Sequence, residues 1–290
     1  MLDRVFIAIN DSIDLIVAVL NEPTSRVIAL IALGAFVGSF LNVVIFRLPS
    51  MIKERALADS SDFFPNLVSE AKAVSNIEGA NLGGFSKAPC CDTKIKAKHN
   101  IPILSWLTLK GKCAYCGADI SFQYIKVEVL TALAFGTIAF MSDTKEAALL
   151  FSALTAILIA IAYIDQKHQL IPEELTLAAA VIGALLIDQD VIAIDLTTGL
   201  TSVIGTYLCL SLLNFLSECM VGKQALGGGD IKLMAALSLI FTTTGSLIII
   251  GLAILLLIIL NKILFNRAKG YQALGPYLAI ISWIGVIVMF

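Results

Sequence analysis

Long apolar runs separated by short polar connections dominate the chain from residue 26 onward. A helix needs ~20 predominantly apolar residues to cross the ~30 Å core of a bilayer. Runs such as Leu247–Leu260 do not alternate between apolar and polar positions, as the strands of a membrane barrel do, so helices are predicted. We expect about eight membrane-spanning helices: Arg26–Phe46, Val127–Met141, Ala147–Ile164, Pro172–Ile187, Leu196–Leu216, Ile231–Phe241, Leu247–Leu264 and Ala273–Phe290.

Two segments need separate arguments. A single helix over Ile231–Leu260 would be roughly 45 Å long, too long for a bilayer without a steep tilt. We therefore expect a break at the Thr/Gly-rich segment Thr242–Gly245. The segment Val5–Leu20 is apolar but contains Asp11 and Asp14, which favours an amphipathic helix in the membrane interface over a span.

Composition agrees with this interpretation. Hydrophobic residues make up 58% of the 290 positions and charged residues 14%, whereas soluble domains have roughly 45–50% apolar residues. The net charge of −2 gives no reason to expect a nucleic-acid partner. The sequence predicts an all-α polytopic membrane protein in four parts: an interfacial segment (1–25), a first membrane helix (26–46), a hydrophilic module (47–126) and a membrane core (127–290).

The distribution of Lys and Arg predicts the orientation, because loops on the cytosolic side carry an excess of them. If the N-terminus is outside, only Arg4, Arg26 and Lys145 lie on the outer side. The turn Asp188–Asp190, also outside, is acidic. We therefore expect the hydrophilic module on the cytosolic face.

Four cysteines lie in this module: Cys90 and Cys91, then Cys113 and Cys116. A cytosolic compartment disfavours disulfides, and paired thiolates across a ~20-residue loop suit tetrahedral zinc. Gly117 can adopt the left-handed conformation that follows the second ligand of such a turn. Because Cys90 and Cys91 are adjacent, the fourth ligand is either Cys90 or His99, and reduced thiols without a metal are the alternative. Cys209 and Cys219 are interpreted as ordinary small apolar residues.

Two aspartates lie at membrane depth. Asp165 ends the third expected span and Asp230 begins the sixth, so both fall at the cytosolic edge of the bilayer. An ionisable group there is costly and usually functional or paired. Each alone could equally be a helix-end residue, and Asp230 in particular could be stabilised by a helix dipole.

Together the two aspartates suggest a reaction. Two carboxylates within a few ångströms share one proton, which leaves one base for water and one acid for a carbonyl, as in aspartic proteases. Gly227 and Gly229 would let an extended substrate lie beside Asp230. Sequence alone does not prove that Asp165 and Asp230 meet.

The chain resembles the bacterial prepilin peptidases, the type IV leader peptidases that also N-methylate their product. Motifs carry this resemblance in order along the chain: Gly38–Pro49, Asn100–Leu107 with Gly111-Lys112-Cys113, Ile164-Asp165 through Ile171-Pro172, Gly227–Leu233 with its G-x-G-D pattern, and Gly275-Pro276-Tyr277.

The resemblance implies an inner-membrane enzyme in which Asp165 and Asp230 are catalytic. It implies cleavage of the basic leader of type IV prepilins or type II secretion pseudopilins, then methylation of the new N-terminal residue from S-adenosylmethionine. Similar proteins have C-P-x-C where this chain has Ala88-Pro89-Cys90-Cys91. Cys91, Cys113 and Cys116 keep their places as zinc ligands, and Cys90 is the candidate for the fourth.

Two other functions are considered. A G-x-G-D intramembrane protease of another branch, without methyltransferase activity, would not need the Arg47–Lys126 module. An ion-coupled transporter would use Asp165 and Asp230 as ion sites near the midplane, but both lie at one edge and no inverted repeat is visible. No glycine-rich nucleotide loop marks a site for S-adenosylmethionine, so its binding residues are not predicted.

Overall fold

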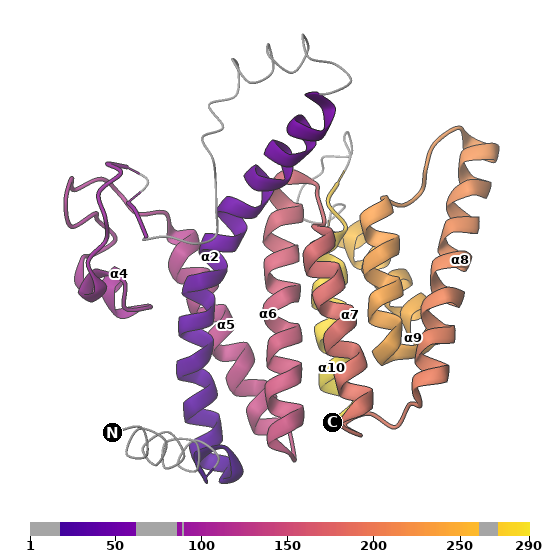
Figure 1. Cartoon of the computed structure of the whole chain (residues 1–290), viewed down its shortest axis with the longest axis horizontal. Helices are drawn as coiled ribbons and strands as arrows, with labels where there is room; N and C mark the ends of the chain where they lie inside the picture. The colour runs from indigo at the N-terminus through magenta and orange to yellow at the C-terminus, as the bar shows by residue number, and fades with distance from the viewer. Residues whose placement is uncertain (1–17, 62–85, 89, 261–271) are drawn as a thin grey trace.

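The computed structural model describes residues 18–61, 86–88, 90–260 and 272–290. Within them the regular structure is helical, as predicted, apart from two isolated β-bridges in the cysteine-rich module. The interfacial helix predicted at Val5–Leu20 lies almost wholly outside these residues. Most of the long helices run side by side along one axis (Figure 1). Their bounds are α2 Pro23–Ser61, η1 Ala97–His99, α4 Leu104–Thr108, α5 Phe122–Met141, α6 Lys145–His168, α7 Glu173–Asp188, α8 Leu196–Val221, α9 Gly228–Leu260 and α10 Gly275–Val288.

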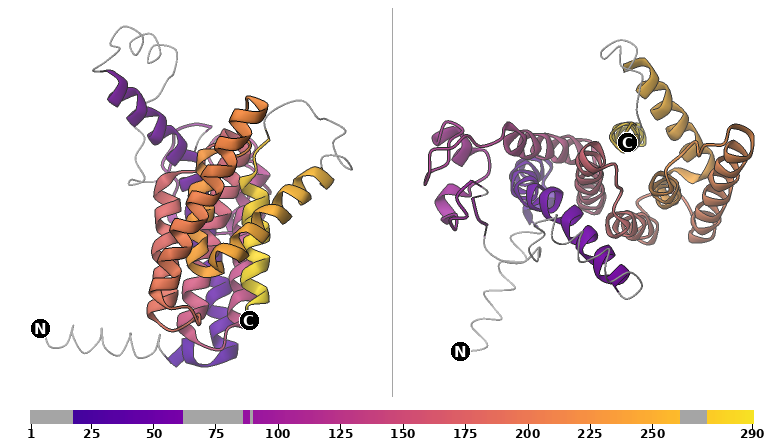
Figure 2. Two further views of the ribbon diagram at one scale, coloured as in Figure 1. Left: turned by 90° about the vertical axis from the view of Figure 1, so that its right-hand side faces the viewer. Right: turned by 90° about the horizontal axis from the view of Figure 1, so that it is seen from above.

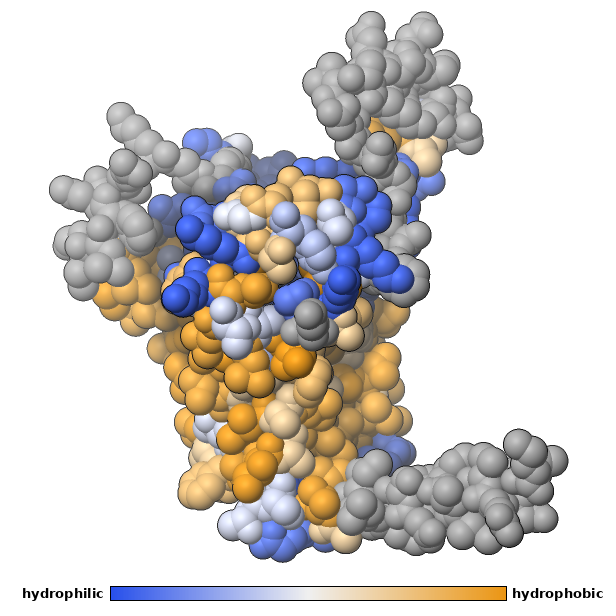
Figure 3. All heavy atoms as spheres, turned by 90° about the vertical axis from the view of Figure 1, so that its left-hand side faces the viewer, coloured by the Kyte–Doolittle hydropathy of each residue, from blue (hydrophilic) through white to orange (hydrophobic). Residues whose placement is uncertain are grey.

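Five described helices are long and apolar enough to cross a membrane, namely α2, α5, α6, α8 and α9. The helices α7 and α10 have 16 and 14 residues. The flank of the molecule is hydrophobic between polar ends (Figure 3). Large apolar side chains such as Phe140 and Ile204 are exposed on it, which is expected where lipid is the solvent. The protein is thus a multi-pass membrane protein, and about eight spans stays a prediction.

Capping residues begin α6 and α8 within two residues of the predicted starts, whereas α8 ends five residues beyond the predicted Leu216. The Asp195 carboxylate accepts a 3.0 Å hydrogen bond from the N–H of Thr198 and caps α8. The Thr144 hydroxyl accepts from the N–H of Ala147 at 3.2 Å and caps α6. Such caps satisfy N–H groups that a helix leaves unpaired. At its other end, α8 stops at Gly222, which has a φ of 69°, the left-handed conformation that ends many helices.

Small residues bring α2 against α5. A Cβ built on Gly34 would lie 2.8 Å from the Cα of Ala132, and one on Gly38 would lie 2.7 Å from the Cα of Glu128. Glycine at such points lets membrane helices approach closely and gain dispersion contacts. The Gly38 motif of the sequence therefore has a packing role at this interface.

Helix α2 does not end where its apolar run ends. The sequence predicts a span that stops at Phe46, whereas the helix continues to Ser61 with Pro49 inside it. Proline removes one backbone hydrogen bond and crowds the preceding turn, which bends a helix without necessarily ending it. The upper part of α2 leans over toward the other helices (Figure 1).

The break predicted at Thr242–Gly245 is present. Thr242 has φ 60° and ψ 176°, so α9 consists of two helical segments that meet at this residue. The Thr243 hydroxyl donates to the carbonyl of Ser202 on α8 at 3.4 Å, which ties the break to a neighbouring helix. The second segment leaves the bundle at an angle to the first (Figure 2). The break predicted from the length of this apolar run is confirmed.

Candidate active site and metal centre

Asp165 lies in the last part of α6 and is 6% exposed. The backbone N–H of Gly275, at the start of α10, donates a 2.7 Å hydrogen bond to its Oδ2. Gln169 then ends α6 with a left-handed φ of 51°, and its N–H bonds to the Asp165 carbonyl at 2.8 Å. The residue is therefore held by both its side chain and its backbone.

Asp230 lies in the first turn of α9, where the helix dipole favours a carboxylate. The backbone N–H of Gly227 bonds to this carboxylate, and a Cβ built on Gly227 would lie 2.8 Å from its Oδ2. Its Oδ1 is buried with no hydrogen-bond partner in the described part of the chain. A buried carboxylate oxygen without a donor is costly, so this oxygen is suited to bind water or substrate.

Asp165 and Asp230 line the same pocket, which has a volume of about 570 Å³. They are close enough for their charges to interact. The pocket walls come from the end of α2, the connection between α6 and α7, and the start of α9. The structure thus brings together the two carboxylates that the sequence predicts as a pair, at the end of the bundle from which the upper part of α2 projects (Figure 1).

Charged side chains surround the pair. Lys232 on α9 forms an ion pair with Glu173 on α7, and Arg55 on α2 forms one with Glu174 at 3.0 Å. All four residues line the pocket. Exposed pairs of this kind add little stability, but they set the charge around the two aspartates. Arg55 was not predicted here, because it lies beyond the expected end of the first span.

The three glycines before Asp230 have different surroundings. A Cβ built on Gly227 would meet Asp230, and one on Gly229 would lie 2.9 Å from the Cβ of Ile171. Gly228 has open space around it. All three line the pocket. Gly227 and Gly229 are therefore close-packing positions, and Gly228 is the one with free space.

The four cysteines of the module converge. The Sγ atoms of Cys90, Cys91, Cys113 and Cys116 all lie within 4.8 Å of one another. Tetrahedral zinc with Zn–S bonds of ~2.3 Å separates its sulfurs by roughly 3.8 Å, so the four thiolates fit one such ion after small adjustments. His99, the alternative fourth ligand, lies outside this cluster, and its ring packs edge-on against Tyr115 at 6.0 Å between centroids.

Two turns of the same backbone shape carry these thiols. In one, the N–H of Gly117 bonds to the Cys113 carbonyl at 3.0 Å, and in the other the N–H of Asp92 bonds to the Ala88 carbonyl at 2.8 Å. Gly117 and Asp92 both have a left-handed φ, 72° and 51°. An isolated antiparallel bridge closes each turn at corresponding positions. The expected conformation of Gly117 is confirmed.

The equivalence of the two turns shows that Ala88 stands at the position where a fourth cysteine would be expected. Ala88 corresponds to Cys113 and is likewise buried, while Cys91 corresponds to Cys116. Cys90, in the middle of its turn, places its Sγ 3.1 Å from that of Cys116 and 4.0 Å from that of Cys91. Hydrogen bonding to the Cys116 side chain raises the pKa of Cys90 to about 12, so Cys90 would have to lose a proton to act as a metal ligand.

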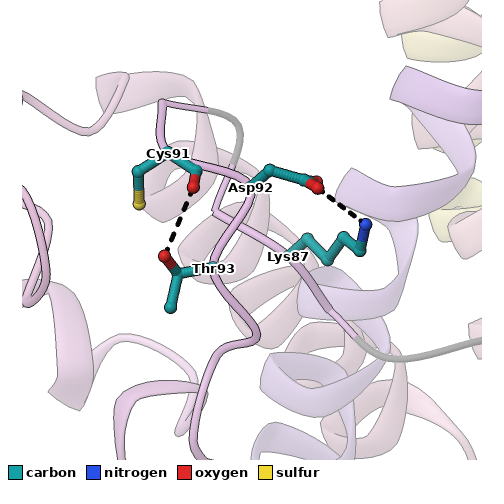
Figure 4. A network of polar contacts seen from close by, with 4 residues as sticks. All are labelled: Lys87, Cys91, Asp92 and Thr93. Carbon is teal, nitrogen blue, oxygen red and sulfur yellow. Dashed lines mark hydrogen bonds and ion pairs between the residues drawn. The ribbon is translucent and has the colours of Figure 1, made fainter.

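The pKa values of two other thiols in the cluster are lowered. Backbone N–H groups, first that of Cys116 and then that of Tyr115, lower the pKa of Cys113 to about 6. The side chain of Thr93 lowers the pKa of Cys91, and Figure 4 shows the Thr93 hydroxyl donating to the Cys91 carbonyl, at 3.3 Å. Thiolates rather than thiols bind metal.

Two features of these sites were missed from the sequence. The contact between Gly275 and Asp165 was not predicted. The sequence indicated only that a helix begins at Gly275-Pro276, because Pro favours the first turn of a helix. Glu128 is buried in α5 and accepts a 2.7 Å hydrogen bond from the N–H of Ile103. The pattern that could have identified Glu128 is a carboxylate at the start of an apolar span, which is usually paired or functional.

These features define a class: a multi-pass helical membrane protein with two aspartates in one pocket and a four-cysteine module beside the bundle. Residues 32–142 match the family described as the bacterial Peptidase A24 N-terminal domain, and residues 152–261 match the type IV leader peptidase family. The chain belongs to the type IV leader peptidase family.

Curated relatives support this assignment. A prepilin leader peptidase/N-methyltransferase of Stutzerimonas stutzeri is 34% identical over 275 residues, 92% of each chain. Proteins of the same name from Dichelobacter nodosus and Neisseria gonorrhoeae are 35% and 33% identical, over 86% and 87% of each chain. No solved structure matches this chain significantly.

Proposed function

We propose that this protein is a prepilin leader peptidase and N-methyltransferase that acts on type IV prepilins or type II secretion pseudopilins. The observation that carries the proposal is that Asp165 and Asp230 line one pocket at one end of the bundle. Relatives that match about nine tenths of the chain are named for the same activity.

In the proposed peptidase reaction, Asp165 and Asp230 share one proton. The ionised member takes a proton from water, and the protonated member polarises the scissile carbonyl, as in other aspartic proteases. The hydrogen bond from Gly275 holds Asp165 in place. The unpartnered Oδ1 of Asp230 is then the oxygen that meets water or the carbonyl.

Substrate access follows from the glycines. A helical substrate must unwind before its amide can reach the two carboxylates. We propose that an extended segment lies beside the start of α9, where Gly228 leaves open space. Gly227 and Gly229 support this approach indirectly, since larger residues there would displace Asp230 or Ile171.

We propose that the N-terminus lies outside, and that the module and both aspartates lie at the cytosolic face of the bacterial inner membrane. The Lys/Arg asymmetry supports this orientation. In this arrangement residues 127–290 form the peptidase core, and the two segments of α9 together with α7 and α10 bring the number of spans to about eight.

The relatives' name also includes methyl transfer. We propose that S-adenosylmethionine donates the methyl group, and that Cys90, Cys91, Cys113 and Cys116 hold one zinc ion with a structural role. Zinc, when bound, would supply cross-linking of the two turns rather than a reaction step. The donor pocket is not assigned to residues.

One experiment tests both proposed activities. Purified protein in detergent or lipid is incubated with a full-length prepilin, and the product mass is measured with and without S-adenosylmethionine. We expect a shortened product, and an added methyl group only with the donor. An Asp165→Asn protein, purified in parallel, is the control for contaminating proteases. A prepilin that stays intact with the wild-type protein contradicts the proposal.

A further inference from the structure

An exposed apolar ridge lies on the cysteine module, away from the peptidase pocket. We define it by four side chains that are about half exposed: Ile101 (43%), Leu104 (59%), Leu107 (54%) and Phe122 (56%). Large apolar side chains grouped in this way usually mark a binding surface. The proposed peptidase reaction does not use them, since none lines its pocket.

Two contacts fix the height of the ridge relative to the membrane-spanning helix α5. The ring of Trp106 in α4 lies 5.7 Å from the ring of Phe122, which is the first residue of α5. The N–H of Ile103 bonds to Glu128, which lies roughly 9 Å further along α5 at ~1.5 Å per residue. The ridge therefore lies beside the first turns of a span and not above it.

This height matches the boundary between headgroups and acyl chains. The 20 residues of α5 make a helix of roughly 30 Å, about the thickness of the hydrocarbon core. A segment beside its first two turns lies at the depth that interfacial helices reach, ~5–10 Å below the headgroups. Figure 3, which views the molecule from the side of the module, shows hydrophobic surface on the module and on the flank beneath it.

Positive charge surrounds the ridge. Lys110 and Lys112 are exposed directly after α4, and the exposed Lys126 lies 5.1 Å from the centre of the Phe122 ring. Anionic lipid headgroups attract basic segments held at the surface. Between Ser86 and Lys126 the lysines outnumber the acidic residues Asp92 and Asp119: they are Lys87, Lys94, Lys96, Lys98, Lys110, Lys112 and Lys126.

We propose that the apolar ridge is inserted into the bilayer leaflet on its own side, with the neighbouring lysines against anionic phospholipid headgroups. The module is then anchored by lipid as well as by the Ile103–Glu128 hydrogen bond. This anchoring does not depend on the proposed enzymatic activity.

The two tryptophans of the chain make the test direct. Replacing Trp283 by Phe leaves Trp106, on the ridge helix, as the only tryptophan. The full-length W283F protein is placed, one copy per disc, in nanodiscs containing phosphatidylglycerol, with or without lipids brominated near the glycerol end of the acyl chain. We expect bromine to quench Trp106 emission about twofold. The L104N/L107N variant should lose most of this quenching.

Three controls keep the result interpretable. Phe140→Trp in the W106F/W283F protein, an exposed position near the other end of α5, gives the full quenching range. Ala114→Asn, exposed on the cysteine turn, should leave Trp106 quenched. Lys110→Gln with Lys112→Gln and Lys126→Gln should reduce quenching in phosphatidylglycerol discs but not in phosphatidylcholine discs.

Trp106 that stays unquenched, while the tryptophan introduced by Phe140→Trp is quenched, overturns the proposal. So does emission that changes only when discs hold two copies, because a second chain would then cover the ridge.

Discussion

The backbone N–H of Gly275 donates a 2.7 Å hydrogen bond to Oδ2 of Asp165 and so ties the start of α10 to the end of α6. A Cβ built on Gly275 would lie 2.7 Å from that oxygen and 2.9 Å from the Asp165 Cβ. Both distances are below normal contact, so only glycine fits here without a shift. The last helix thus helps to position a carboxylate that belongs to another part of the chain.

Gly275→Ala should therefore impair leader cleavage. The added methyl group must push Asp165 aside, and a displacement of ~1 Å in a catalytic group can cost about 100-fold in rate. Gly251→Ala is the matched control, because open space surrounds that position and it does not line the pocket. Cleavage rates of both variants on one prepilin, at equal amounts of inserted protein, decide the matter. Equal rates would show that Gly275 does not position Asp165.

Asp165→Asn and Asp230→Asn should each reduce leader cleavage by about three orders of magnitude or more. The double variant should be no worse than either single one, because residues that act as a unit are not additive. Initial rates of cleavage give the comparison, and membrane yield and thermal stability show whether folding is retained. A single Asn variant with half the wild-type rate would remove that residue from the reaction.

The cysteine cluster should hold about one zinc per chain. Cys113→Ser and Cys90→Ser should each lose the metal, while Cys219→Ser, remote along the chain, should retain it. Ala88→Cys combined with Cys90→Ser should regain it, because Ala88 stands at the backbone position equivalent to Cys113. Elemental analysis of the purified proteins measures this directly. Active wild-type protein without zinc would end the structural-metal hypothesis.

The orientation of the protein in the membrane can be determined by labelling with a membrane-impermeant maleimide. In the proposed topology Cys219 and the cysteine module face the cytosol, so wild-type protein in intact cells should not react. Asp190→Cys places a thiol in the turn between α7 and α8 and should react from outside. Permeabilised cells give the full signal for both proteins. Labelling of the wild type in intact cells, without labelling at residue 190, would invert the topology.

Methyl transfer should not require the aspartates. It needs a bound donor and an amine held in line, and positioning supplies most of the rate. Asp230→Asn protein given pilin already trimmed to its mature N-terminus should still transfer a labelled methyl group from S-adenosylmethionine. A folded Asp230→Asn protein that fails on this substrate would mean that both reactions share one site.

Local rules made part of the structure predictable. The break at Thr242 followed from the length of the apolar run, and the turn at Gly117 followed from the spacing of Cys113 and Cys116. The first span was expected to end at Phe46 with its apolar run, whereas α2 continues to Ser61 with Pro49 inside it, since a helix can bend around one proline. Packing against neighbouring elements decides such cases, and it is not visible in a local pattern.

The shared pocket of Asp165 and Asp230 was less predictable. Both were expected at the same membrane face, but their presence in one pocket depends on how α6, α9 and α10 pack together. Gly275 has its role only through that packing. The position of Cys90 beside Cys116 was also not predictable. It depends on the shape of a turn that is recognised only by comparison with the second turn.

The length of α2 links the active site to the membrane itself. Its 39 residues make a helix of roughly 58 Å along its path, about twice the ~30 Å hydrocarbon core. The part beyond Pro49 carries Arg55 to the pocket wall, so one continuous helix includes both a membrane span and part of the pocket lining. A thinner or thicker bilayer changes the tilt of a membrane helix at small cost. The width of the pocket, and with it the rate of cleavage, should therefore depend on the acyl-chain length of the surrounding lipid.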